Sequence, residues 1–382
     1  MTVIHSVRLV SGGVTTADAW VRFAGGVVAA RGTGDGWRTG EDDDVVDAAA
    51  AAGPDAVLAP GFIDIHGHGG AGVSYDEGPD AVRRARALHR AHGTTRAVIS
   101  LVTAPLPVLA DRAAMVADLA RTDPDVLGSH LEGPFLNVER RGAHEADLLQ
   151  APTPEALRQL LAAGRGTVRQ VTLAPELPGG MDAVRAVVAA GATAAIGHTS
   201  ADATTARAAA DAGARLLTHA LNAMPGLGHR APGPAGAAAG DPRMILEVIA
   251  DGVHLDPEMV RILFAAAPGR IALITDAMAA AGAGPGRYRL GRLDVDVRDG
   301  TARLPAGGAI AGSTLTQDRA LRVAVAAGVG LEEAVRALTE TPARAIGRGQ
   351  TLGALDAGML ADAVLLDADL TVRRVWTAGL EA

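Results

Sequence analysis

Short apolar runs alternate with alanine- and arginine-rich segments along most of the chain. Eight runs have the length of strands, and the segments between them place apolar residues at helical spacing. This alternation is typical of βα units around a parallel sheet. Eight units predict an α/β protein with a (β/α)8 barrel of the TIM type. The runs are residues 62–65, 95–100, 126–131, 168–173, 193–196, 215–217, 245–250 and 271–275.

Helix signals precede two of the segments between these runs. Thr153 and Pro154 stand before residues 156–163, and Asp202 stands before residues 203–212. A Thr or Asp side chain can accept hydrogen bonds from the free N–H groups of a first helical turn, and Pro fits the first helical position. Both segments are therefore predicted to be helices.

Two stretches follow neither the strand pattern of the runs nor the helical spacing between them. Residues 225–243 are rich in Gly, Pro and Ala, which predicts a mobile loop near the active-site face. Residues 282–310 contain Gly-Arg pairs and the alternating sequence LDVDV, which predict a hairpin inserted after the eighth run.

The two ends of the chain have a different pattern from its centre. Residues 1–58 contain short Val-rich runs separated by Gly and Asp clusters, and residues 347–382 repeat this pattern. Such runs favour short antiparallel strands. We expect both ends to form one small β-sandwich domain, with the catalytic barrel at residues 59–346.

Composition and charge restrict the class of protein. The 382 residues are 48% hydrophobic but only 2% aromatic, so the core must consist of Ala, Val, Leu and Ile. A net charge of −8 without a run of basic residues argues against nucleic acid or an anionic membrane as partner. The N-terminus lacks a signal-peptide pattern, and no apolar stretch is long enough to span a membrane. These features predict a cytoplasmic enzyme acting on a small molecule.

Two residue types are missing from the sequence. Without cysteine, the chain can form no disulfide and no thiolate metal site. Without lysine, Schiff-base chemistry, a lysine base and a carboxylated-lysine metal bridge are impossible. Any metal ion must therefore bind to His, Asp and Glu side chains.

His66 and His68 follow the first run and are two residues apart. Strand side chains alternate between faces, so these two imidazoles point the same way, as half of a metal-ligand set would. The alternative is a polar strand end that leads into a Gly-rich loop.

Other runs also end in polar residues. Barrel enzymes place their chemistry at the carboxyl ends of the strands. Those ends carry His130 and Glu132 in the third run, His198 in the fifth, His219 in the sixth and Asp276 in the eighth. The coincidence predicts a metal site, with His130 supporting the ligands rather than binding metal. His5, His89, His92 and His229 are expected at the surface.

Six motifs occur in an order that resembles the N-acetylglucosamine-6-phosphate deacetylases of the amidohydrolase superfamily. The resemblance covers residues 58–347, and the HLEGPF and HALNAMP motifs together are specific for the family. The motifs are PGFIDIHGHG at 60–69, HLEGPF at 130–135, IGHT at 196–199, THALNAMP at 218–225, IADGVH at 249–254 and TDA at 275–277.

The resemblance implies roles for the strand-end residues. It makes Glu132, His198 and His219 the principal metal ligands and Asp276 the catalytic acid and base. Family members that keep both histidines of the first strand hold two ions, and others hold one. One or two divalent ions per chain are therefore expected. Zn²⁺ is the expected ion, with Fe, Mn and Co as alternatives.

The family's reaction removes the acetyl group from N-acetylglucosamine 6-phosphate and gives glucosamine 6-phosphate and acetate. Arg230 and His254 are the expected phosphate contacts, one or both supplied by the partner subunit of a homodimer. The full set of substrate contacts implied by the resemblance is Ala143, His144, Asn222, Ala223, Arg230, His254, Ile310, Ala311 and Gly312.

Two other functions stay open. One is hydrolysis of another N-acyl or cyclic amide, for instance in a related N-acetylated amino-sugar phosphate. The second is a non-catalytic homologue, against which the complete set of ligand residues argues. Metal analysis and dependence of the rate on the 6-phosphate would separate these functions.

Overall fold

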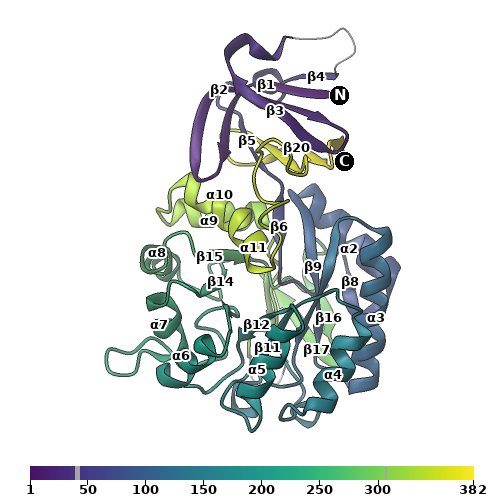
Figure 1. Cartoon of the computed structure of the whole chain (residues 1–382), viewed down its shortest axis with the longest axis vertical. Coiled ribbons are helices and arrows are strands. Elements are labelled where there is room, and N and C mark those ends of the chain that lie inside the picture. The colour runs from purple at the N-terminus through teal and green to yellow at the C-terminus, as the bar shows by residue number, and fades with distance from the viewer. Residues whose placement is uncertain (39–43, 306–307) are drawn as a thin grey trace.

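The structure is a computed structural model that describes residues 1–38, 44–305 and 308–382. It has two parts, a barrel and a small β-domain that contains both chain ends (Figure 1). Within the described residues, no helix is both long and apolar enough to cross a membrane.

Eight parallel strands form the predicted barrel, in the order β15-β14-β13-β12-β11-β10-β9-β6. Backbone hydrogen bonds join the first and last strands at their carboxyl ends, from Asp276 N to His66 O (2.8 Å) and from His68 N to Ala277 O (2.7 Å). The strands are β6 (Phe62–Asp64), β9 (Thr94–Val102), β10 (Val126–Glu132), β11 (Val168–Leu173), β12 (Thr193–Ile196), β13 (Leu216–Leu217), β14 (Ile245–Ile249) and β15 (Ile271–Ile274).

Helices follow the strands and cover the outside of the barrel (Figure 1). The predicted caps are confirmed, because Thr153 Oγ1 accepts from Ala156 N and Asp202 Oδ1 accepts from Thr205 N. The helices are α2 (Pro79–Ala91), α3 (Leu106–Thr122), α4 (Pro154–Ala163), α5 (Gly180–Ala189), α6 (Ala203–Asp211), α7 (Gly233–Gly240), α8 (Pro257–Ala266), α9 (Gln317–Ala326), α10 (Leu331–Leu338) and α11 (Glu340–Ala345).

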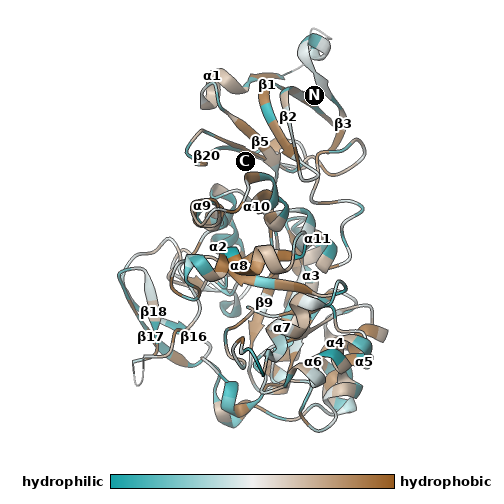
Figure 2. Ribbon diagram, turned by 90° about the vertical axis from the view of Figure 1, so that its left-hand side faces the viewer, coloured by the Kyte–Doolittle hydropathy of each residue, from teal (hydrophilic) through white to brown (hydrophobic). Residues whose placement is uncertain are grey.

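The core consists of small and branched aliphatic side chains, as the composition requires. Every residue of β9 is buried, because one face of each strand meets the barrel interior and the other meets the helices. Hydrophobic residues along β9 and on α8 and α10 appear brown in Figure 2. On α6 the buried face is made of alanines only, so this helix can lie close to the sheet.

The β-domain is one hydrogen-bonded sheet in the order β21-β20-β19-β5-β1-β2-β3, with β4 paired to β1. Phe23 of β2 packs edge-on against Trp376 of β20 at 6.5 Å, so distant strands of the sheet face each other in two layers. The elements are β1 (Thr2–Ser11), β2 (Val14–Ala24), β3 (Val27–Thr33), β4 (Asp44–Asp47), α1 (Ala48–Ala52), β5 (Val57–Pro60), β19 (Ala363–Leu366), β20 (Val372–Thr377) and β21 (Leu380–Glu381).

The chain passes from the β-domain to the barrel at Gly61, between β5 and β6. A Cβ atom at this position would lie 2.3 Å from Thr95 Oγ1, so a side chain would not fit there. The division of the chain at residues 58–59 and 346–347 stays a prediction.

Two irregular stretches differ from their predictions. Residues 225–243, predicted to be a loop, contain α7, whose Ala235, Ala237 and Ala238 are buried; packing outweighs the low helix propensity of its glycines. The insertion after β15 is a three-stranded antiparallel sheet rather than a hairpin, with residues 306 and 307 outside the described part. Its strands are β16 (Gly286–Leu290), β17 (Leu293–Arg298) and β18 (Thr301–Arg303).

Candidate metal centre and active site

Six predicted ligand or acid–base side chains meet at the carboxyl end of the barrel. They follow or end β6, β10, β12, β13 and β15, and the carboxyl ends of parallel barrel strands lie at one face. His198, His219 and Asp276 each have a left-handed backbone, with φ of 45°, 28° and 49°. Residues other than glycine rarely adopt this conformation, and such strain is concentrated at functional sites.

Glu132, His198 and His219 form the first group. Glu132 Oε1 lies 3.3 Å from Nε2 of each histidine, and the two Nε2 atoms are 3.0 Å apart. Ligand atoms around a tetrahedral Zn²⁺, with bonds of about 2.0–2.1 Å, are about 3.3 Å from one another. The spacing of this group therefore fits a metal ion.

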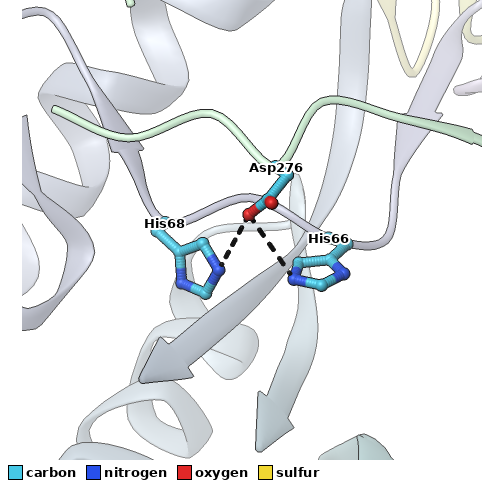
Figure 3. A group of neighbouring side chains, drawn as sticks. All are labelled: His66, His68 and Asp276. Carbon is cyan, nitrogen blue, oxygen red and sulfur yellow. Dashed lines mark ion pairs between the residues drawn. The ribbon is translucent and has the colours of Figure 1, made fainter. Parts of the chain in front are cut away.

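His66, His68 and Asp276 form the second group, and their side chains converge (Figure 3). Asp276 Oδ1 lies 3.7 Å from His66 Nε2 and 3.3 Å from His68 Nε2. Glu132 stands between the groups, because its Oε1 is 3.3 Å from His66 Nε2 and its Oε2 is 3.1 Å from His68 Nε2. Glu132 would therefore be close enough to contribute to both groups if each held an ion.

The His66 ring provides a test of this fit. It is fully buried, and among the described residues its Nε2 has no hydrogen-bonding partner. Leaving such an atom unpaired costs about 1–3 kcal/mol. A cation at the second group would give this nitrogen a partner.

The electrostatics of the site favour positive charge. Burial raises the pKa of Glu132, but the charge of His66 and hydrogen bonds from His198 and His219 outweigh it and hold that pKa well below its ordinary value. Burial lowers the pKa of His68, but hydrogen bonds to Asp276 and Glu132 outweigh it and raise the pKa to about 9. Divalent ions compete with protons for ligands of this kind.

A cavity of about 320 Å³ opens over the ligands and contains most of the predicted site. His66 lies buried beneath it, Ala311 is buried beside it, and Arg230 is exposed outside it. The predicted residues that line the cavity are His68, Glu132, Ala143, His144, His198, His219, Asn222, Ala223, His254, Asp276, Ile310 and Gly312.

The pKa values of two histidines in the cavity are shifted in opposite directions. Burial, together with the charge of His198, lowers the pKa of His144 to about 3, so this ring is neutral at pH 7. Its Nδ1 lies 2.9 Å from Thr103 Oγ1. Burial also lowers the pKa of His254, but Asp251, whose Oδ2 is 2.8 Å from His254 Nδ1, outweighs burial and raises it. The His254 ring therefore keeps its positive charge to a higher pH than a free imidazole does.

Several residues of the site were not predicted from the sequence. Four further residues also line the cavity, namely Glu139, Arg140, Gly142 and Leu290. Glu139 and Arg140 lie in a single 3-10 turn after β10, Gly142 in the loop that follows it and Leu290 in the insertion, and no periodicity marks these positions. Glu247 is fully buried in β14 beside His66. A carboxylate within the apolar sequence ILEVI was a signal that could have identified it.

Two predictions about the remaining histidines were wrong. His89 is buried rather than solvated, because α2 packs against the loop after β6 and His89 Nε2 lies 2.9 Å from Gly69 O. His5 is buried in the β-domain and stacks on Trp37 at 3.9 Å. His130 lies between Ser100 and Thr172, at 2.9 and 2.8 Å.

Comparisons with known proteins agree with this geometry. The sequence pattern of the amidohydrolase family matches residues 57–380. The N-acetylgalactosamine-6-phosphate deacetylase of Escherichia coli O157:H7 is 40% identical over 329 residues, which span 85% of this chain and 87% of the relative. The N-acetylglucosamine-6-phosphate deacetylase of Bos taurus is 37% identical over 338 residues, spanning 85% of this chain and 82% of the relative.

A solved structure is also similar over the whole chain. It is an aspartate-to-alanine mutant of the N-acetyl-D-glucosamine-6-phosphate deacetylase from Mycobacterium smegmatis, in complex with N-acetyl-D-glucosamine-6-phosphate. The TM-score is 0.93 at 41% identity, and the match covers 100% of this chain and 98% of the other.

Proposed function

This chain belongs to the amidohydrolase family, and we propose that it removes the acetyl group from N-acetylglucosamine 6-phosphate. The products are glucosamine 6-phosphate and acetate. The main structural support is the position of Glu132 between two potential ligand groups on the wall of a sugar-sized cavity. A role in amino-sugar catabolism follows from this reaction, whereas the cytoplasmic location stays a prediction.

Glu132, His198 and His219 would hold one divalent ion, and His66 and His68 would hold a second beside Asp276. Zn²⁺ suits nitrogen and carboxylate ligands at tetrahedral spacing. When bound, the ion supplies Lewis acidity, which makes water nucleophilic near neutral pH and polarises the acetyl oxygen.

Asp276 is the proposed acid and base. Burial raises its pKa, but the hydrogen bond from His68 and the charge of His66 outweigh burial and bring it to about 2, so the side chain is a carboxylate at neutral pH. It lines the cavity and can accept a proton from the attacking water. Returning that proton to the amine completes the cleavage, because an amide nitrogen is a poor leaving group until it is protonated.

The substrate contacts divide between the acetyl group and the phosphate. We propose that His144 contacts the acetyl group beside Glu132, and that His254, whose raised pKa favours its charged form, contacts the phosphate. Arg230 is exposed outside the cavity of its own chain, which supports a homodimer in which Arg230 reaches the cavity of the second copy.

A second candidate substrate is N-acetylgalactosamine 6-phosphate, because the E. coli relative at 40% identity is named for that epimer. The test is acetate release from both phosphorylated sugars and from unphosphorylated N-acetylglucosamine. We expect the highest kcat/KM for N-acetylglucosamine 6-phosphate and a much lower value without the phosphate. A higher value for the galacto epimer would reassign the substrate, and equal values with and without phosphate would favour another amide.

A further inference from the structure

Glu247 lies in the middle of β14, inside the barrel and below the cavity, and is fully buried. Both of its oxygens have partners. Oε1 accepts from Gln170 Nε2 at 2.8 Å, and Oε2 accepts from the main-chain N–H of His219 at 3.3 Å. His66 Nδ1 is a further partner of Oε2, at 3.0 Å.

This contact defines which nitrogen of His66 carries the proton. A carboxylate oxygen accepts, and both Glu247 oxygens already accept N–H groups, so we assign His66 Nδ1 as the donor of this contact. With Nδ1 as the donor, Nε2 is the nitrogen whose lone pair a metal ion can take in place of a proton. His66 Nε2 is the atom that faces Glu132 and Asp276 and has no hydrogen-bonding partner among the described residues.

Glu247 also connects the two ligand groups. His66 belongs to the second group, and the main chain of His219 belongs to the first. An apolar side chain would pack in this strand at lower cost, since burying a carboxylate is expensive unless its partners compensate. The structure shows that the contacts of Glu247 with both ligand groups offset the cost of burying its carboxylate.

We propose that Glu247 is a positioning residue of the metal centre. It holds the His66 ring with its Nε2 lone pair towards the second group. Its carboxylate accepts from Nδ1–H, which strengthens Nε2 as a metal ligand. It also fixes the distance between His66 and the turn that holds His219. The inference rests on the metal-dependent function proposed above, but it concerns metal binding alone.

The test is titration of the metal-free protein with Co²⁺, followed by calorimetry and by the visible spectrum of the bound ion. The variants are Glu247→Leu, which removes the acceptor, and Glu247→Gln, which keeps an acceptor but removes the charge. Gln170→Leu is the matched control, because it disturbs the same buried network without touching His66.

We expect wild type to bind two equivalents of Co²⁺. In Glu247→Leu the weaker equivalent should bind about 10–100-fold less tightly, since loss of such a partner has this effect at other metal sites. Glu247→Gln should fall between Leu and wild type. The affinity of Gln170→Leu for the weaker equivalent should stay within about threefold of wild type, even if its Tm falls as much as that of Glu247→Leu.

The proposal would be overturned if both Glu247 variants bound Co²⁺ with wild-type affinity. It would also be overturned if Glu247→Leu and Gln170→Leu lost equal affinity, or if the wild-type protein bound a single equivalent. If Glu247→Leu does not fold, the comparison of Glu247→Gln with Gln170→Leu decides. No substrate is present in these titrations. A chain that binds metal as expected but releases no acetate would therefore contradict the proposed substrate and leave the role of Glu247 intact.

Discussion

At the scale of single residues, Glu132 at the end of β10 has imidazole nitrogens of four histidines within 3.3 Å of its two oxygens. The sequence predicted these side chains because each follows an apolar run that ends at one face of a barrel. Glu247 was not predicted because it lies within an apolar run, where the hydrophobic pattern indicates side chains packed in the core rather than a functional site. Arg140 was not predicted because its position in the cavity depends on a loop path.

Asp276→Asn should leave metal content and folding intact while lowering kcat by about 10²–10⁴-fold, because the amide cannot accept and return a proton. The measurement is steady-state kinetics beside elemental analysis, with wild type as reference. Retention of more than about a tenth of kcat would assign the base to another residue. Joint loss of metal and activity would make Asp276 chiefly a ligand.

The raised pKa of His254 predicts a pH dependence of phosphate binding. A raised pKa means that the ring is charged at lower pH and loses its charge as pH rises through that value, above 6.5. KM for the phosphorylated sugar should therefore rise as the pH is raised through that pKa, over a range in which the phosphate itself is largely a dianion. KM for the unphosphorylated sugar should change little over the same range.

His254→Asn is the control for this prediction. Its KM for the phosphorylated sugar should be raised by about tenfold or more at pH 7, because a charged hydrogen bond contributes about 1.5–3 kcal/mol, and should no longer vary with pH. If KM of His254→Asn keeps the pH dependence of the wild-type protein, another group binds the phosphate.

At the scale of elements, the barrel strands are placed by close packing at their ends. A Cβ atom on Gly197, next to His198, would lie 2.7 Å from Thr172 Cγ2 and 2.7 Å from Thr218 Cβ. Gly197→Ala should therefore force β11, β12 and β13 apart and lower the free energy of unfolding by about 1–3 kcal/mol. Urea unfolding measures this loss.

Gly226→Ala is the matched control for that substitution. Among the described residues, no atom lies within 4 Å of a Cβ added at Gly226, and the backbone there is not left-handed. The unfolding midpoint of this variant should therefore stay near wild type. Equal stability of both variants would mean that the strand ends can spread without cost.

The hydrophobic pattern predicted the barrel strands better than it predicted helix α7. Its sequence GPAGAAAG has poor helix propensity, and only burial of its alanines in the folded chain makes it helical. Local sequence contains no information on that burial. By contrast, the strand runs 168–173 and 193–196 agree with β11 and β12 residue by residue. The Val, Thr and Ile residues in these runs favour a strand from local sequence alone.

At the scale of the whole molecule, a buried ion pair joins the barrel to the β-domain. Arg96 of β9 donates from Nε and Nη2 to the two oxygens of Asp362, at 2.6 and 2.8 Å, and both side chains are buried. Composition and periodicity could not predict this pair, because its partners are 266 positions apart. The sequence did predict that both ends of the chain share one domain.

Asp362→Ala should lower the free energy of unfolding by about 3–5 kcal/mol, because it leaves the Arg96 charge buried without a partner. The double variant Arg96→Met with Asp362→Leu should recover most of that loss. Glu381→Ala removes the exposed pair with Arg374 and should cost less than about 1 kcal/mol. A similar stability of the Asp362 and Glu381 variants in urea unfolding would show that the pair does not join the two domains.

The central claim is that a divalent ion at Glu132 makes this chain a deacetylase, and metal reconstitution tests it directly. Acetate release from N-acetylglucosamine 6-phosphate is measured on the metal-free protein as Zn²⁺ is added back in known equivalents. We expect negligible release without metal and a rise that ends once the sites are filled, at no more than two ions per chain. Full acetate release from metal-free protein, or none from fully loaded protein, would contradict it.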